Sequence, residues 1–287
     1  MRLGVVGMIP SNFTEVTPQH LETIRELELT GAAFHYPGEK MSNLQKKELH
    51  TVRQTFKDCH MDLVQFGIGY SECLFDPEES VRSSLLKKIY QGIETSRELD
   101  SFACLIRTGS LNAKGSYAPS KSNLTLDAKN QLIETLALIT SKAEKEGVNV
   151  VIETHALTIM GTPEINQEVI NEIGSNNLSV VMDYVNHFQN LEHVFNNRDR
   201  IHHIFSLMNP ISILGHCKDI IISPGLVLHI DEAIPGEGEL DLGLALKLWH
   251  EAHPDGYMLL EHLPNEDYPQ AANNTIRIIR DQSIPLW

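Results

Sequence analysis

The chain has 287 residues, a formal net charge of −15 at pH 7 and 41% hydrophobic residues. This length is normal for an α/β barrel, and the hydrophobic content is sufficient for a large core. The negative charge disfavours nucleic acid and anionic membrane surfaces as partners. No segment has the pattern of a signal peptide or a membrane span, so we expect a cytoplasmic protein without a membrane partner.

Short apolar segments alternate with longer segments of helical periodicity along the whole chain. The strands expected from these apolar runs are 3–7, 32–36, 62–66, 102–107, 149–153, 179–183, 211–216 and 257–261. Continuous apolar runs of this length are typical of parallel strands that are covered on both faces. The clearest amphipathic patterns between them predict helices over 80–99, 126–146, 191–208 and 240–252.

Eight strands in alternation with about eight helices predict a parallel sheet, and their number favours closure into a (β/α)₈ TIM barrel. An open, doubly wound sheet is the alternative. That fold usually carries a glycine-rich phosphate turn after its first strand, whereas this chain continues with Gly7-Met8-Ile9-Pro10. No change of composition divides the chain, so we expect a single domain over residues 1–287.

The last four expected strands each end on a residue type that binds metals, namely Glu153, Asp183, His216 and Glu261. The carboxyl ends of barrel strands meet at one face, where active sites lie in this fold. One acidic residue at a strand end is usually a helix cap or half of a salt bridge, but four successive occurrences are hard to explain in that way. Three carboxylates would repel one another unless a cation lay between them. The pattern therefore predicts a site for one divalent ion, with Mn²⁺ expected first and Mg²⁺, Co²⁺ or Zn²⁺ as alternatives.

The C-terminal half resembles the xylose isomerase-like TIM-barrel superfamily, which contains sugar phosphate isomerases and epimerases. The stretches that carry the resemblance are VIETH at 151–155, VMDYVN at 181–186, GHCKD at 215–219, PGEGELD at 235–241 and LEH at 260–262. The resemblance implies that the four metal-binding residues chelate adjacent oxygens of a sugar or sugar phosphate. It also implies that Glu153 and Glu261 move a proton next to a carbonyl, through an enediolate that the metal stabilises.

Five further residues are candidates for contact with the substrate: His155, Asn186, His187, Lys218 and Arg107. Many members of the superfamily have a histidine where this chain has Asn186, and His187 follows it directly. For His155 the alternative is a loop histidine, for Lys218 a surface salt bridge, and for Arg107 an arginine that closes the barrel rim. We expect the loops 66–75, 107–123 and 220–238 to determine specificity. The loop 107–123 is expected to act as a lid or as a contact in a homo-oligomer.

Other functions use a similar site. A metal-dependent dehydratase or lyase acting on a cyclic polyol is the main alternative to a sugar isomerase or epimerase. Phosphodiester cleavage in abasic DNA is disfavoured by the net charge, and by His229-x-Asp231, which reverses the D-x-H pair of the related endonucleases. A barrel that binds a sugar without turnover is disfavoured by the complete set of four metal-binding residue types.

Overall fold

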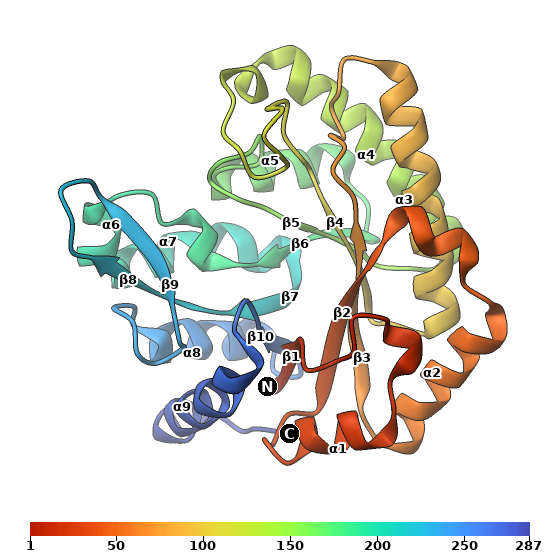
Figure 1. Cartoon of the computed structure of the whole chain (residues 1–287). Helices are drawn as coiled ribbons and strands as arrows, with labels where there is room; N and C mark the ends of the chain where they lie inside the picture. Colours follow the sequence, from red (N-terminus) through yellow and green to blue (C-terminus); the bar gives the residue numbers. More distant parts are fainter.

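Eight parallel strands form a closed barrel in the computed structural model, which describes all 287 residues (Figure 1). The strands follow one another around the barrel in the order β1-β10-β7-β6-β5-β4-β3-β2. Their bounds are β1 Arg2–Val6, β2 Gly31–Pro37, β3 Asp62–Gly69, β4 Ala103–Arg107, β5 Val150–Glu153, β6 Leu178–Met182, β7 Ser212–Cys217 and β10 Tyr257–Leu260. The predicted TIM barrel is confirmed, and each expected strand overlaps one of these eight.

Nine α-helices surround the barrel, and their bounds are α1 Pro18–Arg25, α2 Lys46–Asp58, α3 Glu79–Leu99, α4 Leu126–Glu146, α5 Pro163–Ile173, α6 Leu191–Phe195, α7 Asn197–Met208, α8 Leu242–Ala252 and α9 Tyr268–Asp281. The predicted helix over 191–208 is divided, because the backbone at Asn196 leaves the helical region between α6 and α7. Helix α8 begins at Leu242 because the Asp241 carboxylate accepts a hydrogen bond from the backbone of Leu244. No helix is both long and apolar enough to cross a membrane.

An antiparallel hairpin of β8 (Asp219–Ser223) and β9 (His229–Ala233) follows β7 and lies beside α6, outside the barrel (Figure 1). We expected a loop over 220–238. All five residues of β9 are at least partly exposed, and this strand lacks the apolar run by which the barrel strands were recognised. The hairpin stands at the carboxyl end of β7 and forms one wall of the site described below.

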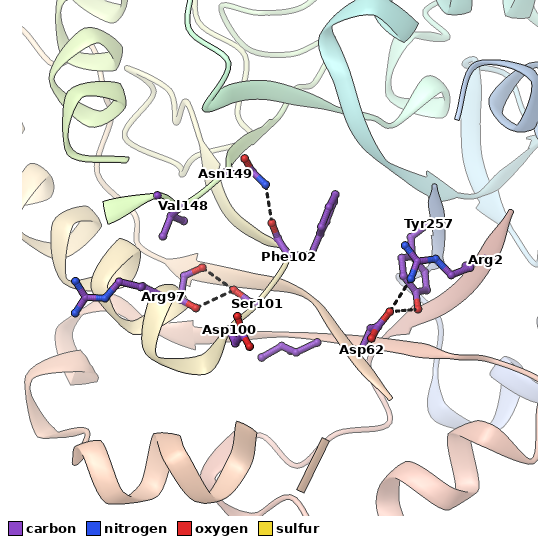
Figure 2. A pocket seen from close by; sticks show the side chains of 12 residues that line it. Arg2, Asp62, Arg97, Asp100, Ser101, Phe102, Val148, Asn149 and Tyr257 are labelled. Atoms are coloured by element: carbon purple, nitrogen blue, oxygen red, sulfur yellow. Dashed lines mark hydrogen bonds and ion pairs between the residues drawn. The ribbon is translucent and has the colours of Figure 1, made fainter. Parts of the chain in front are cut away.

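Alternate side chains of the strands point outward to the helices or inward to the barrel lumen. The lumen contains a cluster of nine buried residues, Ala33, Val64, Ala103, Leu105, Val151, Val181, Leu214, Tyr257 and Leu259. The larger cluster fills the space between the sheet and the helices. At the amino-terminal end of the barrel, a cavity of about 460 Å³ is lined by polar side chains such as Arg2, Asp62 and Asn149 (Figure 2).

Two β-bulges change which side chains point into the lumen. Between β2 and β3 the register passes from Ala32 opposite Leu63 to Ala33 opposite Gln65, so Val64 is an extra residue. Between β6 and β7 the register skips Ile213 in the same way. An extra residue reverses the alternation of the side chains that follow it. The first bulge therefore turns Gln65 inward, and the second turns His216 inward.

Candidate metal centre

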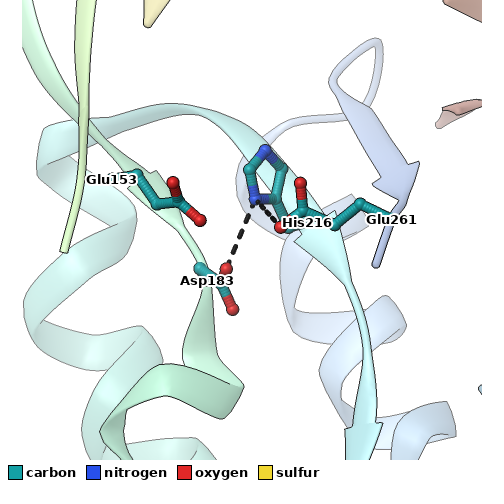
Figure 3. Close-up of side chains that lie close together, drawn as sticks. All are labelled: Glu153, Asp183, His216 and Glu261. Atoms are coloured by element: carbon teal, nitrogen blue, oxygen red, sulfur yellow. Dashed lines mark hydrogen bonds and ion pairs between the residues drawn. The ribbon is translucent and has the colours of Figure 1, made fainter. Parts of the chain in front are cut away.

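The side chains of Glu153, Asp183, His216 and Glu261 meet at the carboxyl end of the barrel (Figure 3). They come from four neighbouring strands, in the order β5, β6, β7 and β10. One potential ligand atom from each residue lies within 4.8 Å of those of the other three. All four side chains are buried. The structure thus brings together the four residues that the sequence suggested for one site.

His216 is oriented by contacts to both of its ring nitrogens. Its Nδ1 lies 3.3 Å from Asp183 Oδ2 and 2.8 Å from Glu261 Oε1, and its Nε2 lies 3.0 Å from the side-chain oxygen of Gln65. Because an amide oxygen can only accept a hydrogen bond, Nε2 carries a proton. This contact directs Nδ1 toward the carboxylates, where a metal ion would bind. Fixing the orientation of a ligating histidine in this way strengthens metal binding.

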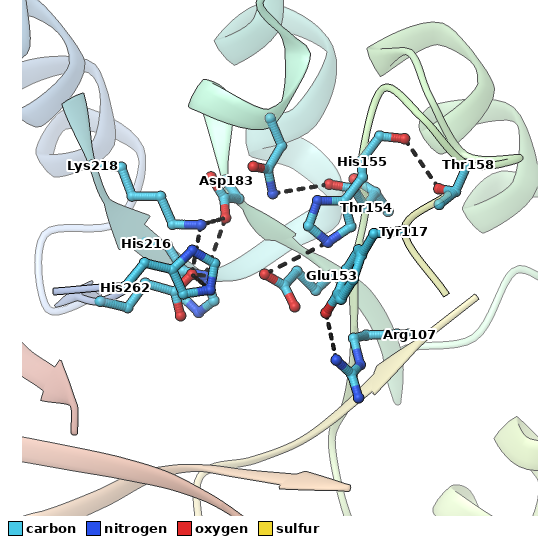
Figure 4. Close-up of polar contacts among 12 residues, drawn as sticks. Arg107, Tyr117, Glu153, Thr154, His155, Thr158, Asp183, His216, Lys218 and His262 are labelled. Atoms are coloured by element: carbon cyan, nitrogen blue, oxygen red, sulfur yellow. Dashed lines mark hydrogen bonds and ion pairs between the residues drawn. The ribbon is translucent and has the colours of Figure 1, made fainter. Parts of the chain in front are cut away.

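Lys218 brings a buried ammonium group into this cluster (Figure 4). Its ammonium group is almost fully buried and lies 2.7 Å from both Asp183 Oδ2 and Glu261 Oε1. Burial opposes the charge of Lys218, but the two carboxylates outweigh it and hold its pKa well above the usual value. The pKa of Glu261 is lowered against the effect of burial, chiefly by His216 and Lys218.

The cluster is suited to a divalent ion. One oxygen of Glu153 (Oε1) and one of Asp183 (Oδ1) are buried without a hydrogen-bond partner, which is costly unless another group satisfies them. With His216 neutral, as a metal ligand must be, three carboxylates and one lysine leave two negative charges, which a divalent cation would neutralise. A donor set of carboxylate oxygens and one imidazole is suited to Mg²⁺, Mn²⁺, Co²⁺ or Zn²⁺. The residues present therefore fit a metal ion of this class.

Comparison with known proteins identifies the family. The model of the xylose isomerase-like TIM barrel family matches residues 21–281. The chain belongs to this family. No curated protein matches the sequence.

Solved structures of the same barrel type are similar in fold and distant in sequence. The 3-keto-D-glucoside 4-epimerase of E. coli is 16% identical with a TM-score of 0.71, over 98% of this chain and 99% of the other. D-psicose 3-epimerase of Clostridium cellulolyticum, solved with D-tagatose, is 12% identical with a TM-score of 0.72, over 98% and 99%. A xylose isomerase-like barrel protein of Mycobacterium smegmatis in complex with magnesium is 12% identical with a TM-score of 0.72, over 98% and 96%.

Two cavities open beside the candidate metal-binding residues of this xylose isomerase-like barrel. We call the first the polar lobe; it measures about 540 Å³, and Glu153, Glu261, Arg107 and His35 help to line it. We call the second the apolar lobe; it measures about 680 Å³ and lies between the turn after β6 and the β8–β9 hairpin. Tyr117 and His262 line both lobes.

Four of the five residues suggested for substrate contact lie in or beside these lobes. His155 and Asn186 line the apolar lobe, and Arg107 lines the polar lobe. The Arg107 guanidinium donates a hydrogen bond to the hydroxyl of Tyr117, and His155 Nε2 lies 3.7 Å from Glu153 Oε1. Lys218 is buried against Asp183 and Glu261 of the candidate metal site, so it does not form the surface salt bridge considered as an alternative.

The placement of His187 does not fit the predicted substrate contact and corrects it. This side chain is fully buried and lines neither lobe. Its Nε2 lies 3.2 Å from Thr154 Oγ1, and its Nδ1 lies 3.4 Å from the carbonyl oxygen of Gly161. Burial lowers the pKa of His187 to about 4, so it is neutral at pH 7. His187 packs behind the site and holds the loop after β5.

The structure adds Gln65, His35 and Tyr117, which sequence reasoning missed. Gln65 had a recognisable signal, because it is a polar residue within the apolar run of β3. His35 ends the lumen-facing row of β2 and packs over Gly67, where a Cβ atom would collide with its ring. Tyr117 lies in the loop 107–123, and its position depends on a contact with Arg107 that no local pattern predicts.

Proposed function

We propose that the chain is a divalent-metal-dependent sugar epimerase or isomerase. The observation that carries this proposal is the order of the four side chains along the barrel. Glu153 and Glu261 occupy the two ends of the row, and Asp183 and His216 lie between them. Two carboxylates on either side of a central ion are the arrangement needed to remove a proton from one face of a carbon and return one to the other. Two of the similar solved structures are named as epimerases.

In the proposed reaction, one glutamate removes the proton next to the substrate carbonyl, and the other protonates the opposite face. Burial disfavours the charge of Glu153, but contact with His155 outweighs it, so the pKa of Glu153 is lowered and the group is ionised as a base requires. A bound divalent ion, most suitably Mn²⁺, would supply positive charge where negative charge develops on the substrate oxygens. Asp183 and His216 would hold this ion.

The remaining polar side chains would position the sugar. The Lys218 ammonium lies 2.7 Å from Asp183 Oδ2 and Glu261 Oε1 but makes no hydrogen bond of good geometry, so it could donate to a substrate oxygen. Asn186 donates to the carbonyl oxygen of Thr154 and lines the apolar lobe. Arg107 and His155 stand on either side of Tyr117, where they would bind hydroxyl groups of the substrate.

Proton exchange with solvent tests this proposal. The protein is stripped of metal with EDTA and incubated in D₂O with a panel of ketoses, aldoses and keto-glycosides, with and without Mn²⁺. NMR then follows the loss of carbon-bound proton signals and the appearance of epimers or isomers. Exchange next to the carbonyl that requires added metal is expected.

Other products would overturn the proposal in identifiable ways. Loss of water from a cyclic polyol, with a new enone or dione absorbance, would indicate the dehydratase. Cleavage of an abasic duplex would indicate a phosphodiesterase. Replacing Mn²⁺ with Mg²⁺, Co²⁺ or Zn²⁺ in the same assay would identify the ion that supports the highest rate.

A further inference from the structure

The apolar lobe is larger than the proposed chemistry requires. The metal-binding residues Glu153 and Glu261 line the polar lobe and not the apolar one, so the reacting carbons of a sugar belong at the polar side. Either lobe alone lies within the range of roughly 300–1,000 Å³ that is usual for small-molecule sites. A free monosaccharide that binds over the metal-binding residues and fills the polar lobe would therefore leave the apolar lobe empty.

The walls of the apolar lobe are mainly hydrophobic, as seven of its twelve lining residues are. Val185 and Phe188 come from the turn after β6, and Ile220 and Ile230 face them from the β8–β9 hairpin. Leu157 lies in the loop after β5 with 53% of its surface exposed. An apolar group bound in this lobe would cover Leu157 and remove hydrophobic surface from water.

The charges around both lobes disfavour a phosphate group. Neither lysine nor arginine lines the apolar lobe, and Glu232 lies at its edge. Arg107 is the one arginine of the polar lobe, and its guanidinium already donates to Tyr117 and lies near the rings of Tyr117 and Tyr70.

We propose that the substrate is an uncharged sugar that carries an apolar group through a glycosidic bond and a ketone on another ring carbon. The sugar ring binds over the metal-binding residues in the polar lobe, and the apolar group binds in the apolar lobe. Tyr117 and His262 line both lobes and mark the passage between them. This inference rests on the proposed function, because it uses the metal-binding cluster as the position of the reacting carbons.

Matched glycosides test the inference without any turnover. Isothermal titration calorimetry in the presence of Mn²⁺ compares phenyl with methyl β-D-glucopyranoside, galactopyranoside and mannopyranoside, and with glucose 6-phosphate. We expect at least one phenyl glycoside to bind roughly tenfold or more tightly than its methyl partner, because the phenyl group becomes buried. The inference is overturned if no phenyl glycoside binds more tightly than its methyl partner, or if glucose 6-phosphate binds more tightly than all of them.

Substitutions locate the preference in the apolar lobe. Leu157→Asn and Ile230→Asn are each expected to reduce the ratio of phenyl to methyl affinity by about threefold or more. Leu226→Asn is the matched control, because Leu226 lies at the tip of the same hairpin, is fully exposed and does not line the lobe. A ratio that changes equally in the control would show that the phenyl group binds elsewhere and would overturn the inference.

Failure of this inference can be told apart from failure of the proposed function. If the protein prefers phenyl glycosides but exchanges no proton in D₂O, the inferred binding site is supported and the proposed reaction is overturned. If the protein exchanges protons of free ketoses and shows no preference for phenyl glycosides, the proposed function is supported and the inference is overturned.

Discussion

The two ends of the barrel both gather charged side chains, but they balance the charges differently. At the carboxyl end, three carboxylates and a histidine are buried around one lysine, and some of their oxygens have no partner. At the amino-terminal end, Arg2 Nη1 lies 2.7 Å from Asp62 Oδ2, which also accepts a hydrogen bond of 2.8 Å from the hydroxyl of Tyr257 (Figure 2). Both charges of this pair are partly exposed to water.

The difference distinguishes a cluster that fits a metal ion from an ion pair that needs no further ligand. A partly exposed ion pair is solvated and contributes little to stability, and it has no need of a further group. A buried cluster with excess negative charge is unfavourable unless a cation completes it. Size alone would not distinguish the two ends, because the amino-terminal cavity of about 460 Å³ is similar in volume to the polar lobe.

The sharpest test of this contrast removes one charge from each end. Glu261→Gln is expected to lower the rate of metal-dependent proton exchange by about a thousandfold or more, because the amide cannot accept the proton. Asp62→Asn, at the opposite end, should leave the exchange rate within about twofold. Circular dichroism would check that both variants are folded. Full activity in Glu261→Gln would exclude the proposed role of this residue.

The second test concerns Lys218, whose ammonium group is buried at the carboxyl end. Without metal, Lys218→Met is expected to lower the free energy of unfolding by about 3 kcal/mol, because buried carboxylates lose their partner. Saturating Mn²⁺ should recover most of this loss. Urea denaturation with EDTA and with Mn²⁺ measures both quantities. Lys247→Met is the control, since its exposed pair with Glu251 should contribute little. An equal loss with and without metal would contradict the charge balance described above.

A smaller effect is expected from the residue that orients His216. Gln65→Leu keeps a similar volume but removes the acceptor for Nε2, so Mn²⁺ should bind about 10- to 100-fold more weakly. Calorimetric titration of the metal-free protein measures this affinity directly, and it does not depend on turnover. Gln19→Leu on the exposed face of α1 should leave the affinity unchanged. Wild-type affinity in Gln65→Leu would mean that the three carboxylates alone determine metal binding.

The smallest effect is expected at the amino-terminal end. Asp62→Asn should change the free energy of unfolding by less than about 1 kcal/mol, because Asp62 is 56% exposed and its pair with Arg2 is solvated. The remaining difference should decrease further at high salt. A loss of several kcal/mol in urea denaturation would show that this end also carries a buried electrostatic cluster.

The sequence alone was sufficient to predict the barrel and to name the four residues that meet at its carboxyl end. Both follow from local patterns. An apolar run indicates a strand that is covered on two faces, and a polar residue at the end of such a run can be seen in the sequence without knowledge of the fold. Glu153, Asp183, His216 and Glu261 could therefore be grouped once parallel strands were assumed, because all of them lie at or next to a strand end.

Tertiary structure decided how these residues are supported. The bulges that turn Gln65 and His216 inward depend on the register of each strand against its neighbour, which packing around the whole barrel determines. His187 follows Asn186 directly in sequence, yet it is buried behind the site by contacts with Thr154 and Gly161. Lys218 faces two carboxylates only because three different strands converge. These outcomes depend on contacts between residues far apart in the chain, which no local pattern records.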